Sequence, residues 1–179
     1  MAQHIIARLG IFLLCIGIGA CETSSNANNS PSQTAASSKA CTLATPLKPG
    51  IPGSPDNPIK SDINPNGDSE LSHLMRKMLK DLQKIRPSIL AQSKTIPPVQ
   101  GHERIRCSWP SDPGIRGPLF GALSDTYLSS LKFFESTAPT NDSYNGVVAA
   151  CLGCHNSFCP GPIHLIQNLW IEGPGDSSL

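Results

Sequence analysis

Three cysteines and a histidine lie close together near the end of the 179-residue chain. Cys151, Cys154 and His155 form a C-x-x-C-H sequence, and Cys159 follows. This sequence is the attachment motif of c-type haem. Two thiols three residues apart on a helix can bind the two vinyl groups of one porphyrin, and the adjacent imidazole can bind its iron. The motif therefore predicts one haem c, covalently held by Cys151 and Cys154, with His155 as proximal iron ligand.

The same residues have other uses in proteins. A structural zinc ion could take three thiolates and one imidazole from Cys151, Cys154, Cys159 and His155. A thioredoxin-like C-x-x-C would need a strand before its helix, and the pattern predicts no strand. Disulfides are the third alternative. Because the first two thiols fall on a predicted helix rather than in a small loop, haem is favoured over zinc.

The elements that must position this cluster are helices. Apolar residues at helical spacing predict a first helix with Asp68 or Ser69 as N-cap, and Pro87 should end or kink it. A second run covers residues 119–134. A third helix starts near Thr140 or Asn141 and carries the cysteine cluster. A short last segment should turn four side chains inward: Ile163, Ile166, Leu169 and Trp170. With strands improbable, the predicted class is all-α.

The region between the first two long helices is the weak part of the pattern. Residues 87–118 hold six prolines, which leaves room for a short helical turn but not for a long helix.

A distal iron ligand would decide the function. A methionine or histidine in the sixth position makes an electron-transfer centre, whereas an open position binds small gases such as nitric oxide. At 100° per residue, Met75 and Met78 face the core while His73 points to solvent. His164 also lies off the apolar face of its segment. His102, in the proline-rich region, stays open as a ligand, and Leu74 would shield an open site.

The start of the chain predicts export. Arg8 precedes an uncharged apolar run, Leu9 to Ala20, which is too short to span a membrane but fits a signal peptide. Ile18-Gly19-Ala20-Cys21 resembles the lipobox of bacterial lipoproteins, so residues 1–20 are expected to be removed and Cys21 lipidated. The expected location is the periplasm, anchored to a bacterial membrane.

A tether is predicted between the anchor and the domain. Residues 21–65 are rich in Ser and Asn and then in Pro, which indicates a flexible segment and a polyproline II spacer. Residues 66–179 are the predicted domain. The 14 basic and 13 acidic side chains nearly balance, so no nucleic-acid partner is expected.

The position of the motif suggests a family. C-x-x-C-H on the last long helix, in "YNGVVAACLGCHNSFCPGPI", behind a first helix containing "SELSHLMRKM", resembles the class II c-type cytochromes, the cytochrome c-prime group, and within it a subset of bacterial monohaem lipoproteins. The resemblance covers the whole predicted domain. It implies an up-and-down four-helix haem bundle, here with a reduced or missing second helix. It also implies a distal ligand early on the first helix, which makes Met75 the first choice and Met78 the second.

The family resemblance sets the functional expectations. The chain is expected to pass single electrons between redox partner proteins at the periplasmic membrane surface, without being an enzyme. The alternative is a five-coordinate haem protein that binds gases. Relatives of this kind often pair through their first helices, so a homodimer is a candidate assembly. Candidate haem contacts are the walls Phe120, Tyr127, Val147 and Val148, and the propionate partners Arg76, Arg104, Arg106 and Arg116.

Three cysteines remain for disulfides. In an oxidising compartment one pair is expected. Because Cys107 and Cys159 both belong to the predicted domain, we expect them to pair, leaving Cys41 alone in the tether.

Overall fold

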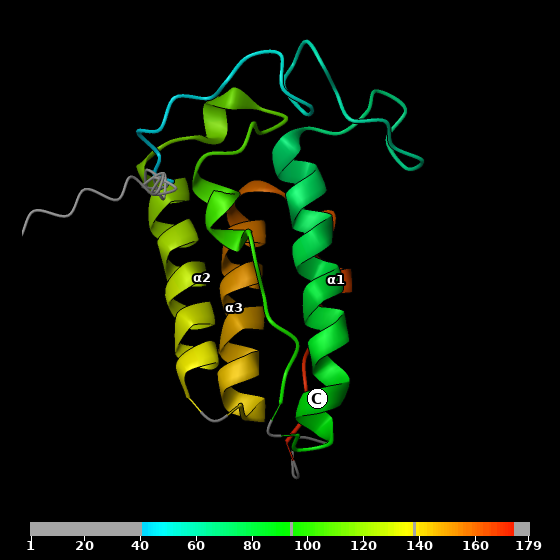
Figure 1. The fold of residues 1–179 in the computed structure, drawn as a ribbon, viewed down its shortest axis with the longest axis vertical. Coiled ribbons are helices and arrows are strands. Elements are labelled where there is room, and N and C mark those ends of the chain that lie inside the picture. Colours follow the sequence, from blue (N-terminus) through cyan, green and yellow to red (C-terminus); the bar gives the residue numbers. More distant parts are fainter. Residues whose placement is uncertain (1–40, 94, 138, 174–179) are drawn as a thin grey trace, which may run out of the picture. The chain divides into compact units, whose positions relative to one another are not determined.

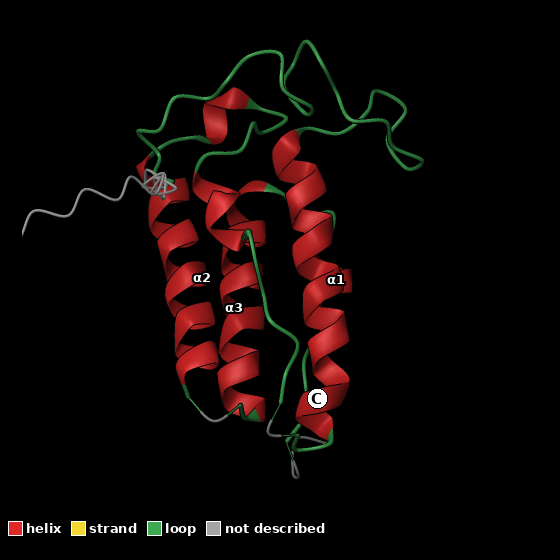
Figure 2. Ribbon diagram, viewed as in Figure 1, coloured by secondary structure: helices red, strands yellow, loops and turns green. Residues whose placement is uncertain are grey.

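The computed structural model describes residues 41–93, 95–137 and 139–173. The predicted signal peptide, Cys21 and the tether up to residue 40 lie outside these residues. The described residues belong to one compact unit, Lys39–Leu179. Its elements are α1 (Glu70–Leu90), η1 (His102–Arg106), η2 (Pro113–Ile115), α2 (Pro118–Ser136), α3 (Asn141–Phe158) and α4 (Ile163–Gln167). In the described part of the chain the two β-bridges are isolated and form no strand, so the all-α prediction is confirmed (Figure 2).

Three long helices run side by side, α1 and α2 in one direction and α3 in the other (Figure 1). Between α1 and α2 the chain returns along α1 without a long helix, and only the 3-10 turns η1 and η2 break this return. Between α1 and α2 the described chain thus has a loop with two short 3-10 turns in place of a long helix.

Helix α1 begins where the sequence indicates. Ser69 is the N-cap, and its hydroxyl accepts from Ser72 N at 3.1 Å. The helix does not end at Pro87, as one form of the prediction held, but continues one turn to Leu90. A proline has no backbone N–H, so the helix lacks the hydrogen bond that this group would donate to the carbonyl four residues earlier. The rest of the helix can keep its hydrogen bonds if the residues around the proline stay in the α region. The buried face of Ile85 and Ile89 supports this last turn.

The core lies between the three long helices, and α2 and α3 pack most closely. Tyr144, Val147 and Val148 are fully buried, and α3 starts with a capping box between Thr140 and Ser143. Phe134 meets Tyr144 edge to face at a centroid distance of 6.1 Å. The helical periodicity of both segments is therefore confirmed.

The last segment differs from its prediction at one residue. Ile166 and Leu169 are buried, but Trp170 is 41% exposed and Ile171 takes the inward position. The reason is that α4 ends at Gln167, so helical spacing no longer applies. The amide of Asn145 instead binds the backbone of Ile171 in both directions, at 2.8 and 3.0 Å.

The predicted spacer between residues 41 and 65 is wrong: this segment is folded onto the domain. Gly53 O accepts from Glu70 N at 3.0 Å, and Ser54 is only 1% exposed. Gly53 has φ +90°, and a Cβ there would lie 2.3 Å from Glu70 N, so only glycine allows this approach. Backbone hydrogen bonds such as Ser54 N to Ile51 O and Asn57 N to Ser54 O, both 3.0 Å, form turns in this segment.

The predicted Cys107–Cys159 disulfide is also wrong. Cys41 pairs with Cys107 across 66 residues of sequence, and Cys159 is a free, exposed thiol. The prediction placed Cys41 in a free tether, but its segment packs on the domain, and the disulfide joins it to Cys107 at the end of η1.

A buried histidine fixes the loop that replaces the second helix. His102 is 2% exposed, with Nδ1 2.7 Å from the Tyr127 hydroxyl on α2 and Nε2 3.1 Å from Asp81 Oδ2 on α1. A carboxylate can only accept, so Nε2–H donates to Asp81 and Tyr127 O–H donates to Nδ1. His102 is thereby held as the neutral tautomer, and it links three elements.

Among the described residues, no helix combines the length and apolar character required to cross a membrane.

The disulfide yields a stability prediction. Cys107→Ser should lower the free energy of unfolding by about 3–4 kcal/mol, because a closed loop of this length restricts the unfolded chain. Denaturant unfolding measures it. Cys159→Ser, at the exposed free thiol, should stay within about 0.5 kcal/mol of the parent. Equal losses in the two variants would contradict the pairing.

Acid should weaken the fold through His102. Burial lowers the pKa of His102 below its ordinary value of 6.5 more than the hydrogen bond to Asp81 raises it. As pH falls below about 6.5, the unfolded chain takes up a proton that the native state refuses, so stability declines by up to about 1.4 kcal/mol per pH unit. Asp81, whose pKa is lowered from 3.8, loses its contribution only at more acidic pH.

Urea unfolding between about pH 7 and pH 5 tests this. His102→Gln should flatten the decline, whereas His73→Gln, at an exposed position, should preserve it. A decline that survives His102→Gln unchanged would refute the assignment.

Candidate functional site

A cavity of about 570 Å³ lies between α1, α4 and the end of α3, within the size range of small-molecule and cofactor sites. Met75 lines it from α1, and Cys154 and His155 line it from α3. Its remaining lining is largely apolar and includes Leu71, Leu79, Ile115, Phe120, Phe158 and Ile166. The cavity thus brings together three of the predicted site residues, which are far apart in the sequence.

The imidazole of His155 is held from one side. Its Nδ1 lies 2.9 Å from the backbone carbonyl of Cys159, at the C-terminal cap of α3. A carbonyl accepts, so Nδ1 carries a proton, and in the neutral ring the lone pair is then on Nε2. Nε2 has no hydrogen-bond partner among the described residues. This pattern, one ring nitrogen donating to a carbonyl and the other free, is typical of a metal-binding histidine.

The two motif thiols lie one turn apart on α3. Cys154 is 8% exposed and lines the cavity, while Cys151 is partly covered and packs against the apolar core. Burial raises the pKa of Cys151 to about 12, with the nearby Cys154 adding to the shift. Burial, followed by the effect of Cys159, also raises the pKa of Cys154. Both thiols are therefore protonated at neutral pH.

The two candidate methionines are separated by the structure. Met75 is half-buried and lines the cavity, whereas Met78 is 4% exposed within the core and does not. Leu74, considered as a shield, is also in the core, and Leu71 and Leu79 line the cavity instead. The sequence could have indicated Leu79, because it lies four residues after Met75 on the same face.

The other histidines of the described residues do not line the cavity. His73 and His164 are exposed, as the helical wheel predicted. His102, which had stayed open, has both ring nitrogens bonded to Tyr127 and Asp81.

Of the four candidate arginines, Arg76 lines the cavity. It forms an ion pair with the buried Asp68. Arg104 pairs with Glu70, Arg106 with Asp125 at 3.0 Å, and Arg116 donates to the Leu43 carbonyl.

Close to Arg76, at the start of α1, the cavity is lined by three serine hydroxyls that the sequence did not reveal. Ser69, Ser72 and Ser111 hydrogen-bond to one another at 3.0–3.1 Å. The cavity therefore has an apolar body and a polar end at the start of α1.

Among the predicted walls, Phe120 lines the cavity, while Tyr127, Val147 and Val148 lie in the core.

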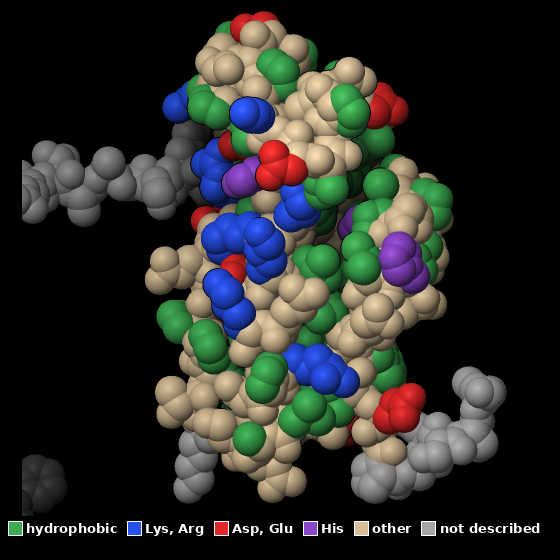
Figure 3. Space-filling view, turned by 90° about the vertical axis from the view of Figure 1, so that its right-hand side faces the viewer, with side chains coloured by type: hydrophobic (Ala, Val, Ile, Leu, Met, Phe, Trp, Pro, Cys, Tyr) green, Lys and Arg blue, Asp and Glu red, His purple; other side chains and the backbone are tan. Residues whose placement is uncertain are grey.

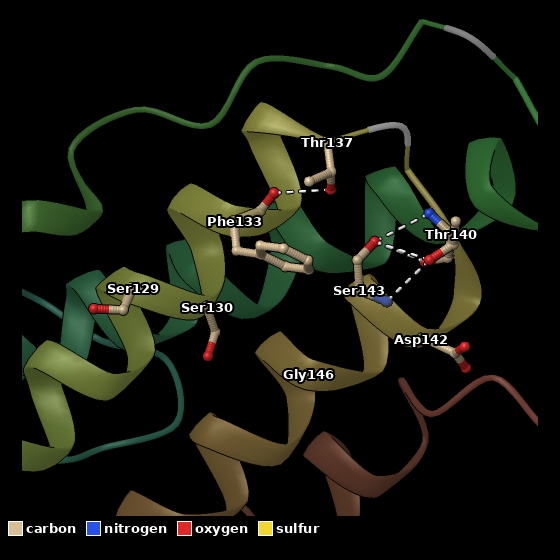
Figure 4. A pocket seen from close by; sticks show the side chains of 8 residues that line it. All are labelled: Ser129, Ser130, Phe133, Thr137, Thr140, Asp142, Ser143 and Gly146. Carbon is tan, nitrogen blue, oxygen red and sulfur yellow. Dashed lines mark hydrogen bonds between the residues drawn. The ribbon is translucent and has the colours of Figure 1, made fainter.

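A second hollow, of about 560 Å³, lies between α2 and α3 (Figure 4). Its lining includes the 59%-exposed ring of Phe133. Hydroxyls around it serve the helix ends: Ser143 and Thr140 cap each other, and Thr137 Oγ1 donates to Phe133 O at 2.9 Å. None of the predicted site residues line it.

The residues of the first cavity can be compared with what a zinc ion and a haem each require. Within the described ranges, no three His, Cys, Asp or Glu side chains are arranged to hold a metal ion, so the four candidate zinc ligands are not gathered. A haem needs less from the protein: one imidazole nitrogen, one further ligand, and an apolar cavity beside the C-x-x-C thiols. Met75, Cys154 and His155 line such a cavity, whereas Cys151, one turn before Cys154, packs against the core and does not line it.

Comparison with protein-family models, with curated proteins and with solved structures finds no match to this chain.

Thiol reactivity should follow this environment. In chain produced without haem attachment, iodoacetamide should alkylate Cys159 first, because it is exposed, and Cys151 and Cys154 more slowly, because burial raises the pKa of both thiols. Timed alkylation followed by mass spectrometry of an unreduced digest measures the order. Cys41 and Cys107 should stay unlabelled, and labelling of Cys151 and Cys154 as fast as that of Cys159 would contradict the prediction.

Proposed function

We propose that this chain is a monohaem c-type cytochrome that passes single electrons between redox partner proteins. The observation that carries the proposal is the meeting of Met75 and His155 at one apolar cavity, from helices separated by most of the domain. A methionine and a histidine are the axial ligand pair of electron-transfer cytochromes. In this role Cys151 and Cys154 would hold the haem, and His155 and Met75 would bind its iron.

When bound, the haem supplies an iron that accepts and returns one electron. The chain's own residues do the rest. The Cys159 carbonyl fixes the orientation and tautomer of His155, and it makes the ring a stronger ligand. The apolar side chains of the cavity limit water around the iron, which tunes its potential. At the polar end, Arg76 and the hydroxyls of Ser69 and Ser72 would bind the propionate carboxylates of the haem.

The proposed location is the periplasmic surface of a bacterial membrane, with a lipid on Cys21. This part of the proposal rests on the sequence of the first 21 residues. A tether of this kind would raise the local concentration of the domain near membrane-bound partners.

The sixth ligand can be tested with a matched pair of substitutions. Met75→Leu and Met78→Leu each remove a sulfur with little change in side-chain volume. In holoprotein, Met75→Leu should abolish the weak sulfur-to-iron absorption band of the oxidised state and lower the reduction potential. Met78→Leu should leave both unchanged. Optical spectra of both oxidation states and potentiometry measure the result.

A high-spin spectrum in the parent that responds to carbon monoxide would instead support the five-coordinate, gas-binding alternative. Loss of the band in Met78→Leu alone would place the wrong methionine at the iron. A product with no covalent haem would overturn the proposal itself.

A further inference from the structure

We propose that the α1 side of the cavity docks a redox protein whose electron-exchanging face has clustered Asp and Glu side chains. The inference rests on the proposed function, because it takes the cavity as the place where electrons enter or leave. It adds the chemistry of the partner, which the C-x-x-C-H motif does not specify.

Helix α1 is strongly basic. It carries five basic side chains, Arg76, Lys77, Lys80, Lys84 and Arg86, and two acidic ones, Glu70 and Asp81. Both carboxylates are engaged, Glu70 with Arg104 and Asp81 with Lys77. The uncompensated charge of the helix is therefore positive.

Lys80 and Lys84 carry this positive charge. Both are exposed, and neither has an ion-pair partner in the part of the chain that the structure describes. They are four residues apart, hence neighbours on one face, and Lys80 lines the cavity itself. Like charges at this spacing slightly destabilise a helix, so folding does not explain them. Figure 3 shows lysine and arginine side chains gathered on this side of the molecule.

Exposed apolar side chains flank the same cavity. Ile63, 75% exposed, lines it from the segment before α1, and Leu165, 44% exposed, lines it from α4. An apolar patch with charge at its edge is the composition of a transient protein interface, where charge steers the approach and apolar contact excludes water.

Charge complementarity selects the occupant. A two-fold dimer through this face, the pairing that the family resemblance suggested, would bring each lysine pair toward its own copy, and like charges oppose that contact. A uniformly anionic membrane surface fits less well, because the exposed Asp112 lines the cavity beside Ser111, at the end near Ser72. A protein can place its carboxylates opposite Lys80 and Lys84 and keep them away from Asp112.

Voltammetry on charged monolayers tests the inference. A gold electrode covered with carboxylate-terminated alkanethiol is the probe for an acidic partner face, and an ammonium-terminated layer is its opposite. Holoprotein should adsorb and give a reversible wave on the carboxylate layer only, and high salt should remove it. Adsorbed mass, from surface plasmon resonance, gives a readout independent of the haem.

Lys80→Glu on α1 and Lys132→Glu on the exposed side of α2 make the same change in net charge. Lys80→Glu should reduce adsorption about tenfold, and Lys132→Glu should leave it nearly unchanged. Lys80→Gln, a milder change, should fall between the parent and Lys80→Glu. Equal losses in the two Glu variants would mean that net charge alone is sensed, which overturns the docking face.

The remaining outcomes separate this inference from the proposed function. A wave on bare graphite without preference for carboxylate refutes the docking face and leaves the cytochrome intact. No wave on any electrode refutes electron transfer, and the docking inference with it. Binding to phosphatidylglycerol vesicles that Lys80→Glu abolishes would assign the face to a membrane instead. A dimer in sedimentation that the same variant disrupts would assign it to a second copy.

Discussion

The arrangement of the domain depends on how the start of α1 is held. The first three N–H groups of this helix bind three separate acceptors: Gly53 O for Glu70, Trp109 O for Leu71, and Ser69 Oγ for Ser72. Helix starts always leave such donors unsatisfied, and capping by one residue is the usual answer. Here two of the acceptors come from segments before and after the helix. The bonds therefore fix both the position of α1 and its rotation about its axis, and the rotation decides which methionine faces the cavity.

On the side of α1 away from the cavity, the buried His102 holds the helix through a side-chain hydrogen bond to Asp81. A second helix would have supplied a long apolar face between α1 and α2, whereas the proline-rich return supplies the buried Ile105, with Ile96 and Val99 packed against the core. His102 replaces part of that packing with two hydrogen bonds in a buried place, one to each neighbouring helix. A hydrogen-bonded link is directional where apolar packing is not, so it keeps α1 and α2 in register with few residues. It also leaves the opposite side of α1 free to line the cavity with Met75, Leu71 and Leu79.

What the sequence could predict follows from how local each signal is. The N-cap at Ser69, the capped start of α3 and the facing of Met75 come from short-range periodicity, and the structure has them as predicted. The failures are long-range. The partner of Cys107 could not be found because Pro-rich composition made residues 41–65 resemble a free spacer. The inward turn of Ile171 instead of Trp170 depends on a hydrogen bond to Asn145. That Met75 and not Met78 lines the cavity depends on the rotation of α1 and the position of α3, which no pattern on α1 contains; only the family resemblance favoured Met75.

The Cys41–Cys107 disulfide has a mechanical consequence. Tension applied to the chain before Cys41 reaches a branch point there, where one path runs through residues 42–106 and the other crosses directly to Cys107. The path through the disulfide is far shorter than the path through residues 42–106, so the disulfide bears the load. The turns at Gly53, the whole of α1 and the cavity-facing Met75 all lie within the closed loop and are not stretched. With the proposed lipid on Cys21, a pull on the chain before Cys41 would thus pass through Cys107 toward the start of α2. The distance between α1 and α3 would then stay unchanged.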